Sequence, residues 1–423
     1  MSVKPFRGLR YAAGIPELAQ LVAPPYDVIT PEQQPRFHST HSHNVIRLIL
    51  DPMQPTDTEE NNRYTRSAAT LRDWRRSGVL VQDACPAIYL YRHAYTHRGR
   101  FYMRYGLVAR VKLAEPGQRR IVPHERTLDA PKADRLRLLQ STRANLCPIF
   151  LCYSSAEGKG ALLHRSIIDW CQATAPTSAV TFDGVEHAMW RIDDESRVAL
   201  VGQVLEYAPL LIADGHHRYE SACTYRDQQR QANGSRTGEE PWEYVMAYLT
   251  ALDAEGMLIL PIHRLVRGIE HHQAMAQLDQ LFQAELCADE EQLAAWLGAS
   301  DGLRFGVYGG QGRYVRLTPK PGVNLSELTE PSALAPWRRL AVTILHQVVL
   351  KRWGVTEQSV SYTADVAEAM RSVDRGAADL AVFVQPTPVT EVRTIALYGE
   401  RMPPKSTFFY PKLLTGLVIN PLE

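Results

Sequence analysis

The chain has 423 residues, which is long enough for two or three domains and for a sizeable apolar core. Hydrophobic residues make up 45% and charged residues 22%, as in an ordinary globular protein. The 47 Lys and Arg residues nearly balance the 46 Asp and Glu residues. This balance argues against a nucleic-acid binder, because such proteins usually carry a basic excess.

The cysteines and the apolar segments indicate the compartment. The six cysteines are scattered without a C-x-x-C pair, which predicts reduced thiols rather than a zinc site. The first residues lack the apolar segment of a secretory signal, and no run approaches the roughly 18 apolar residues of a membrane span. We therefore expect a cytoplasmic protein that acts on a small-molecule substrate, with neither a membrane nor a nucleic acid as partner. The sequence leaves the oligomeric state open and is compatible with a homodimer.

The hydrophobic pattern predicts several elements in the first part of the chain. Residues 1–57 are rich in Pro and His and favour irregular structure with short strands. A stripe of apolar residues predicts a helix over 64–74 that ends near Gly78. Residues 87–113 alternate around His97-Arg98-Gly99-Arg100, as in a hairpin of two long strands. We further expect a helix over 134–144 and a short buried strand over 148–153.

The rest of the chain alternates between helical and strand patterns. We expect a helix over 194–206, an apolar strand over 209–213, an amphipathic helix over 217–231 and a strand over 242–252. Beyond residue 265, expected helices over 270–284, 289–298 and 333–352 alternate with expected strands over 303–308, 313–317 and 379–384. The alternation predicts an α/β or α+β fold. We divide it into an N-terminal α+β segment (1–115), a core (116–265) and a C-terminal α/β unit (266–423).

The strongest local pattern is the strand–turn–helix at Asp214-Gly215-His216-His217-Arg218. A glycine at the strand end permits a tight turn, and the helix that follows directs its free N–H groups outward, which makes an anion site. Arg218 adds a planar fork suited to phosphate or carboxylate. His216 and His217 can donate hydrogen bonds or transfer protons near neutral pH. The alternative interpretation is that Asp214 only caps the helix and the histidines are solvated.

A second candidate is Pro123-His124-Glu125-Arg126-Thr127, which precedes a cluster of Lys132, Asp134 and Arg135. A carboxylate beside a histidine can act as a general base, so Glu125 and His124 are candidate catalytic residues, with Asp214 as a further carboxylate. On its own, however, a His-Glu pair is more often a surface ion pair.

Two shorter segments carry further candidates. Pro24-Pro25-Tyr26-Asp27 is a rigid turn that places a phenol and a carboxylate, or else a simple structural corner. His263 and Arg264 follow a strand and are candidates for the same functional site as the residues named above.

Residues 399–407 nearly match a phosphate-binding P-loop. Pro404 stands where the second glycine is needed, and proline has no N–H to offer to a phosphate, so we reject the P-loop. Lys405, Ser406 and Lys412 remain candidates for a polar site.

Six motifs occur in one order between residue 24 and the region of residue 412: PPYDVI, PHERT, KADR, IADGHHRYE, LPIHRLV and MPPKSTFFYPKL. In this set and order the chain resembles the DUF1015 family, whose name carries no activity. The stretch from Pro-His-Glu to DGHHR also resembles the core of the ParB/sulfiredoxin superfamily, which includes partition CTPases, sulfiredoxin and free-serine kinases. The resemblance implies a ParB/sulfiredoxin-like core with an N-terminal extension.

The superfamily resemblance implies roles for individual residues. Nucleotide phosphates would bind at Gly215, His216, His217 and Arg218, and Glu125 would be the catalytic base, as in free-serine kinases. The accessory or substrate-contacting candidates are Tyr26, Asp27, Thr127, Lys132, Arg135, His263, Arg264, Lys405 and Ser406. Two departures matter: about 90 residues separate Glu125 from Gly215, which requires an insertion, and sulfiredoxin would need a cysteine where His216 stands.

These observations predict a phosphotransferase that acts on a small hydroxylated metabolite such as serine. Its donor would be a nucleotide or pyrophosphate, and Mg²⁺ would share the phosphate charge. Two other classes stay open: a nucleotide-binding regulatory or partition-like protein, and a phosphoester hydrolase that uses the same carboxylate and histidines.

Overall fold

The computed structural model describes residues 2–13, 17–125, 127–156, 158–233, 237–298 and 302–423. The chain forms two compact units: unit 1 comprises 1–122, 127–257 and 411–423, and unit 2 comprises 123–126 and 258–410. Both combine sheets with helices, which confirms the predicted mixed α/β class. The finer division at residues 115 and 265 stays a prediction. Within the described ranges, no helix has both the length and the apolar character to cross a membrane.

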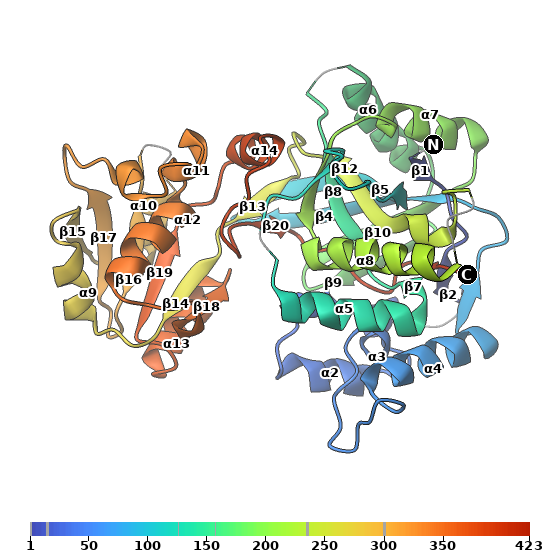
Figure 1. Ribbon diagram of the computed structural model, residues 1–423, viewed down its shortest axis with the longest axis horizontal. Coiled ribbons are helices and arrows are strands. Elements are labelled where there is room, and N and C mark those ends of the chain that lie inside the picture. Colours follow the sequence, from blue (N-terminus) through green and yellow to red (C-terminus); the bar gives the residue numbers. More distant parts are fainter. Residues whose placement is uncertain (1, 14–16, 126, 157, 234–236, 299–301) are drawn as a thin grey trace. The chain divides into compact units, whose positions relative to one another are not determined.

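A nine-stranded mixed sheet forms the centre of unit 1, as far as the described residues show (Figure 1). Its order is β6-β11-β8-β12-β5-β4-β10-β9, and β1 pairs with β5 at the side. The β8–β12 and β6–β11 pairs are parallel, and the other pairs are antiparallel. The strands are β1 (Val3–Lys4), β4 (Ile88–His97), β5 (Arg100–Lys112), β6 (Ile121–Val122), β8 (Ile149–Tyr153), β9 (Ser178–Phe182), β10 (Val185–Ile192), β11 (Leu210–Asp214) and β12 (Tyr244–Ala251).

The hairpin predicted over residues 87–113 is confirmed as β4 and β5. Arg98 and Gly99 form its two-residue turn with φ of 49° and 74°. Positive φ at both positions matches the twist of the flanking strands, and glycine adopts it without a steric cost. Both strands contain several aromatic and β-branched residues, which suit a sheet surface that is buried.

Helices α6 (Gly158–Ala173), α7 (Glu195–Leu205) and α8 (His216–Asn233) pack on one face of this sheet and share its apolar core. Helix α5 (Asp129–Thr142) lies beside α8, and α4 (Arg63–Arg76) lies beside α5 (Figure 1). The helix that was predicted to end near Gly78 is α4, and it begins with a capping box formed by Asn62. The predicted helices over 134–144 and 194–206 are confirmed as α5 and α7.

The other face of the sheet buries polar and aromatic side chains, among them Tyr91, His93, Arg104 and His187. The last segment of the chain contacts this face. A guanidinium N–H of Arg104 donates to the Pro411 carbonyl at 2.6 Å, and the Leu414 N–H donates to the Tyr91 hydroxyl at 3.3 Å. Buried side chains thus hold the segment that carries Lys412.

The smaller elements of unit 1 are mostly near the N-terminus. They are β2 (Leu9–Tyr11), α1 (Leu18–Leu21), η1 (Tyr26–Val28), α2 (Gln33–Thr40), α3 (Ile46–Ile49), β3 (Leu80–Gln82), β7 (Ala144–Asn145), η2 (Pro241–Glu243) and β21 (Asn420–Pro421). The expectation of irregular structure with short strands over 1–57 was wrong for α2 and α3, because Val45, Leu48 and Ile49 pack in a core with α4. Tertiary packing here overrides the weak local signal.

Unit 2 contains a six-stranded antiparallel sheet, counted over the described part of the chain, with the order β15-β17-β16-β19-β14-β18. The strands are β14 (His263–Val266), β15 (Phe282–Cys287), β16 (Phe305–Tyr308), β17 (Tyr314–Pro319), β18 (Val360–Thr363) and β19 (Leu380–Val384). Helices α9 (His271–Leu278) and α12 (Ala341–Ile344) and the π-helical segment η4 (Leu345–Leu350) pack on one face. Helices α10 (Glu290–Leu297) and α13 (Val366–Asp374) pack on the other.

The remaining elements of unit 2 are short. They are β13 (Leu258–Leu260), η3 (Leu325–Leu328), α11 (Ala335–Arg339), η5 (Glu357–Ser359), α14 (Val389–Leu397) and β20 (Phe408–Tyr410). The helix expected over 270–284 was wrong beyond Leu278, because residues 282–287 pair as β15 with β17. The helix expected over 333–352 is interrupted at Leu340 and continues as a π-helical turn.

Candidate functional site

The turn at Asp214-Gly215 has the predicted strand–turn–helix form. Strand β11 is buried up to Ala213, and Gly215 turns the chain with a φ of 89°, which favours glycine. Helix α8 then begins at His216, and the Tyr219 N–H donates to the Gly215 carbonyl at 2.9 Å. Because the first N–H groups of an α-helix have no intrahelical acceptor, this end of an 18-residue helix presents positive potential.

Cationic groups surround the nearly buried carboxylate of Asp214. Lys412 pairs with one of its oxygens and Arg218 with the other, the latter at 2.5 Å. Burial alone would raise the pKa of Asp214, but Lys412 and Arg218, with His216, hold it below its usual range. The Asp214 carboxylate is therefore ionised, and the two cationic side chains of Lys412 and Arg218 pair with this one anion. This excess favours an added anion at the turn.

Arg218 also has structural partners. Its guanidinium donates to the Pro148 carbonyl as well as to Asp214, and among the described residues its buried Nε has no hydrogen-bond partner. A Cβ on Gly215 would lie 3.0 Å from the guanidinium carbon. The side chain therefore folds back over the turn, and in this conformation it binds the protein's own groups.

The Tyr26-Asp27 turn lies near Arg218, since Tyr26 and Arg218 line the same small cavity. The guanidinium of Arg135 stacks 3.9 Å above the Tyr26 ring, and burial raises the pKa of Tyr26. Tyr26, Arg135, Cys147 and Arg218 all line a small cavity of about 50 Å³. The structure thus brings together predicted residues from three separate segments of unit 1.

The segment after the Pro-His-Glu motif lies along helix α8. The Leu128 N–H donates to Nε2 of His217 at 3.0 Å, which places the proton of a neutral His217 on Nδ1. The Thr127 hydroxyl donates to Glu220 at 2.7 Å, and the Lys132 carbonyl accepts from Ser221 at 2.9 Å. Thr127 and Lys132 therefore brace the first turns of α8. Arg126 lies outside the described residues.

His124 and Glu125 belong to unit 2, where the MPPKST turn holds them. The Glu125 carboxylate accepts from the Lys405 N–H at 2.8 Å. His124 is fully buried, its carbonyl accepts from the Met402 N–H at 2.8 Å, and its Nε2 lies 2.8 Å from the Thr407 hydroxyl. The segment rejected as a P-loop is thus the part of unit 2 that positions the candidate base.

Arg264 is fully buried and close enough to Glu125 for their charges to interact. It donates to Nε2 of His346 at 3.1 and 3.2 Å and to the Lys405 carbonyl at 3.1 Å, and it stacks over Tyr362. Burial lowers the pKa of Arg264 to about 10, against the opposing effect of Tyr362 and Glu125. Arg264 therefore stays cationic at neutral pH.

Two predicted residues of unit 2 have mainly packing contacts. His263 precedes Arg264 on β14, and neighbouring strand residues point to opposite faces, so its ring packs against Phe383 at 5.0 Å instead. Ser406 is buried and donates to the Pro403 carbonyl at 2.6 Å, which closes the turn.

The sequence interpretation missed three contacts. His346 lies within the helix expected over 333–352 and was given no role, Tyr362 was not considered, and Lys412 was a candidate for a polar site. A lone histidine in the apolar run Val342–Leu350 was the available signal for His346. The expectation that Glu125 and the Gly215–Arg218 turn share one cleft stays a prediction. In the described ranges, no group of three or more His, Cys, Asp or Glu side chains is arranged to hold a metal ion.

Comparison with known proteins identifies the family. Residues 3–343 match the family model described as "Protein of unknown function (DUF1015)", so the chain belongs to the DUF1015 family. No curated protein matches the chain.

Among solved structures, a free serine kinase in complex with AMP is similar at 12% identity and a TM-score of 0.35, over 69% of this chain and 83% of that one. A variant of that kinase was solved with ADP. C-terminally truncated SbnI from Staphylococcus aureus is similar at 12% identity and a TM-score of 0.37, over 74% and 87%. A conserved hypothetical protein from Pyrococcus furiosus is similar at 13% identity and a TM-score of 0.33, over 69% and 87%. The ParB/sulfiredoxin-like core stays a prediction.

Proposed function

We propose that this member of the DUF1015 family is a phosphotransferase that moves a phosphoryl group from a nucleotide or pyrophosphate to the hydroxyl of a small metabolite, in the manner of a serine kinase. The observation that carries the proposal is the excess of cationic charge around Asp214 at the start of α8, where Lys412 and Arg218 face one carboxylate. Oriented N–H groups and fixed cations are what phosphoryl transfer requires, since its catalysis is mostly positioning and electrostatic stabilisation.

The donor phosphates would lie against the N–H groups of His216 and His217. Lys412 would exchange part of its contact with Asp214 for a phosphate oxygen, because its flexible ammonium can serve both. Arg218 would keep the turn in shape through Asp214 and the Pro148 carbonyl. This division makes Lys412 the main mobile cation and Arg218 chiefly a positioning residue.

Glu125 would take the proton of the acceptor hydroxyl. Its Oε1 accepts the backbone N–H of Lys405, which fixes the orientation of the carboxylate. The kinetic experiments below test this role of Glu125.

Mg²⁺ fits this chemistry as a partner of the donor. The ion usually keeps several waters and binds through one or two carboxylates plus substrate phosphates, so it needs no protein cage. Asp27 is an exposed carboxylate whose charge acts on Arg218, and it would supply such a ligand. When bound, Mg²⁺ would neutralise part of the phosphate charge.

The test is an incubation of the full chain with Mg²⁺, single nucleotides or pyrophosphate, and pooled hydroxylated metabolites, followed by phosphorus NMR. A new phosphomonoester signal that depends on both donor and acceptor supports the proposal. Release of inorganic phosphate without an acceptor would favour the hydrolase class. Nucleotide binding by calorimetry without any turnover would favour the regulatory class, and the absence of both would reject the anion site.

A further inference from the structure

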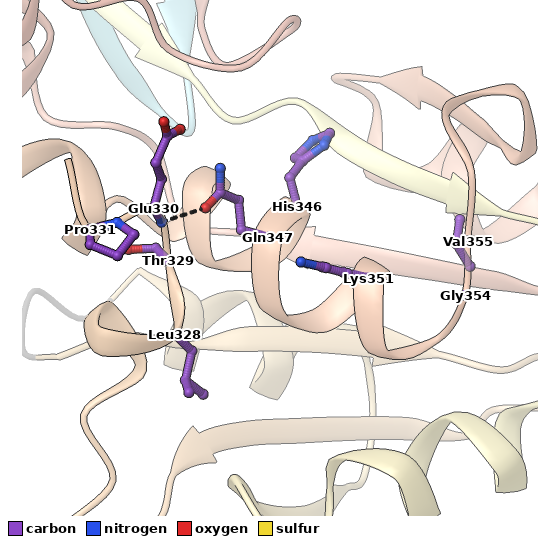
Figure 2. Close-up of a pocket in the computed structure, with 9 residues that line it drawn as sticks. All are labelled: Leu328, Thr329, Glu330, Pro331, His346, Gln347, Lys351, Gly354 and Val355. Carbon is purple, nitrogen blue, oxygen red and sulfur yellow. Dashed lines mark hydrogen bonds between the residues drawn. The ribbon is translucent and has the colours of Figure 1, made fainter. Parts of the chain in front are cut away.

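A pocket of about 580 Å³ lies within unit 2, and nothing in the proposed phosphotransfer uses it. Its volume falls in the range of about 300–1,000 Å³ that is usual for small-molecule sites. The polar groups that line it come from two segments: Thr329 and Glu330 follow η3, and His346, Gln347 and Lys351 belong to η4 and its last turn (Figure 2).

The two segments are fastened to each other. The Glu330 N–H donates to Oε1 of Gln347 at 2.9 Å, drawn as the dashed line in Figure 2. In that view the side chains of Glu330, Gln347 and His346 project to the same side of the helix. The backbone of Glu330 is therefore tied to Gln347, and its carboxylate accepts a hydrogen bond from the Ser332 hydroxyl at 3.1 Å.

The π-helical geometry of η4 sets the positions of the other groups. In a π-helix the hydrogen bonds join residues five apart, so residues separated by four or five positions share one face. Lys351, directly after η4, is five positions from His346 and four from Gln347. In a regular α-helix His346 would turn away from Lys351, so the π-helical turn is what places an imidazole, an amide and an ammonium along one pocket. Such turns occur frequently at functional sites.

His346 is fixed as a hydrogen-bond donor toward a ligand. Its Nε2 accepts from two nitrogens of Arg264, so a neutral ring carries its proton on Nδ1. Burial and then the charge of Arg264 lower the pKa of His346 to about 3, so the ring is neutral at physiological pH. The contacts with Arg264 also fix the orientation of the His346 ring, which reduces the entropic cost of ordering this ring when a ligand binds.

The formal charges of the pocket indicate the class of ligand. Glu330 supplies one negative charge, Lys351 one positive charge, and His346, Gln347 and Thr329 are neutral. A ligand with a single charge would pair with only one of these two exposed ionic groups. A ligand with both an ammonium and a carboxylate would satisfy both.

We propose that this pocket binds a small zwitterion of the α-amino-acid class, with its ammonium on Glu330, its carboxylate on Lys351 and its side chain toward His346 and Gln347. The inference does not rest on the proposed phosphotransfer, since binding requires no phosphate donor.

The test is binding to the full chain in the absence of nucleotide and Mg²⁺. The proteinogenic L-amino acids are added singly at millimolar concentration in a thermal-shift experiment, and the strongest binder is titrated by calorimetry. We expect saturable binding of at least one of them. Its N-acetyl derivative, which lacks the ammonium, and its carboxamide, which lacks the carboxylate, should each bind at least about tenfold more weakly, the usual scale for a charge-assisted hydrogen bond.

Single-site variants assign the binding to this pocket. Glu330→Gln and Lys351→Met should each weaken binding at least about tenfold. The matched controls Glu291→Gln and Arg352→Met change exposed charges of unit 2 outside the pocket and should bind as the native chain does. All four positions are exposed, so the variants should fold, and circular dichroism checks this.

Three outcomes would overturn the inference: no amino acid binds, the N-acetyl derivative or the carboxamide binds as well as the parent, or both pocket variants keep native affinity. If amino acids bind here and no phosphoryl transfer is found, the pocket stands and the proposed function fails. If phosphoryl transfer occurs and both pocket variants keep native affinity, the proposed function stands and the pocket inference fails.

Discussion

The carboxylate of Glu125 accepts a hydrogen bond from the backbone N–H of Lys405 at 2.8 Å, across 280 positions of the sequence. Arg264 donates a hydrogen bond to the Lys405 carbonyl in the same turn. An acid, a buried cation and a backbone amide therefore lie together within unit 2. A glutamine at position 125 would keep an oxygen for the Lys405 N–H. Structure and basicity can therefore be separated by one substitution.

Glu125→Gln should lower turnover on a verified substrate by roughly 10²–10⁴, the usual scale for a general base, because the amide cannot take a proton. Donor affinity should change only a fewfold, and the melting temperature should stay close to that of the native chain. Steady-state kinetics, calorimetry and thermal unfolding measure the three quantities, with Glu291→Gln as the control. Full turnover in Glu125→Gln would remove Glu125 as the base and turn attention to Asp214 and Asp27.

Lys412→Met should weaken binding of nucleotide or pyrophosphate by about 2–3 kcal/mol, since a charge-assisted hydrogen bond to phosphate is lost while the aliphatic stem is kept. Asp214 retains Arg218, so the chain should still fold. Calorimetry at two salt concentrations checks the prediction, with Lys320→Met as a control in unit 2. Unchanged affinity would show that the donor does not bind at Lys412.

Arg218→Ala should affect stability as well as binding. It removes a partner from a nearly buried carboxylate and from the Pro148 carbonyl, which should cost about 3–5 kcal/mol of the free energy of unfolding. Denaturant unfolding measures this loss. Near-native stability with a large loss of donor affinity would contradict the positioning role and restore Arg218 as a direct phosphate ligand.

Gly215→Ala should destabilise the chain more than Gly184→Ala. Both glycines have positive φ, 89° and 74°, so both variants pay the backbone cost of about 1–2 kcal/mol. Only at Gly215 would the new Cβ meet a neighbour, the Arg218 guanidinium at 3.0 Å, whereas Gly184 faces open space. We expect an additional loss of about 1–3 kcal/mol at Gly215, measured by urea unfolding. Equal losses would mean that Arg218 moves away at no cost.

The free energy of unfolding should fall as the pH drops below about 6.5, in part because of His187. Burial, and then the charge of Arg104, lower the pKa of His187 from 6.5 to about 3. His93 lies beside it with a pKa lowered by burial, Arg104 and His187. Since the unfolded chain binds protons on these rings and the folded chain does not, acid favours unfolding between the two pKa values.

The loss attributable to His187 at pH 5 should be about 2 kcal/mol relative to pH 8. Urea unfolding of the native chain and of His187→Gln at several pH values tests this. The variant should start from a lower stability, because the 2.7 Å contact of His187 with the Tyr91 hydroxyl is altered, but its stability should depend less on pH. An unchanged pH dependence would show that His187 is not the group that titrates.

The sequence alone was sufficient for the elements whose signals are local. The hairpin turn at Arg98-Gly99 and the strand–glycine–helix unit at Asp214-Gly215 each depend on a few adjacent residues, and both conformations are present. Residues 279–284 were misassigned because Gln, Leu and Ala suit a helix, whereas residues 282–284 pair with β17 as a strand.

The candidate sites show the same contrast between features set by adjacent residues and features set by long-range contacts. Local pattern identified Glu125, Arg264, Asp214 and Arg218 as residues with chemistry to offer. The partners of these residues come from far along the chain: Lys412 is 198 positions from Asp214, and His346 is 82 positions from Arg264. Such contacts form only when the packed sheets and the π-helical turn bring distant parts of the chain together. The periodicity of neighbouring residues does not indicate which distant side chain will make the contact. The sequence by itself thus determined which groups can bind phosphate or take a proton, and the tertiary structure decided which cation, amide or imidazole stands beside each of them.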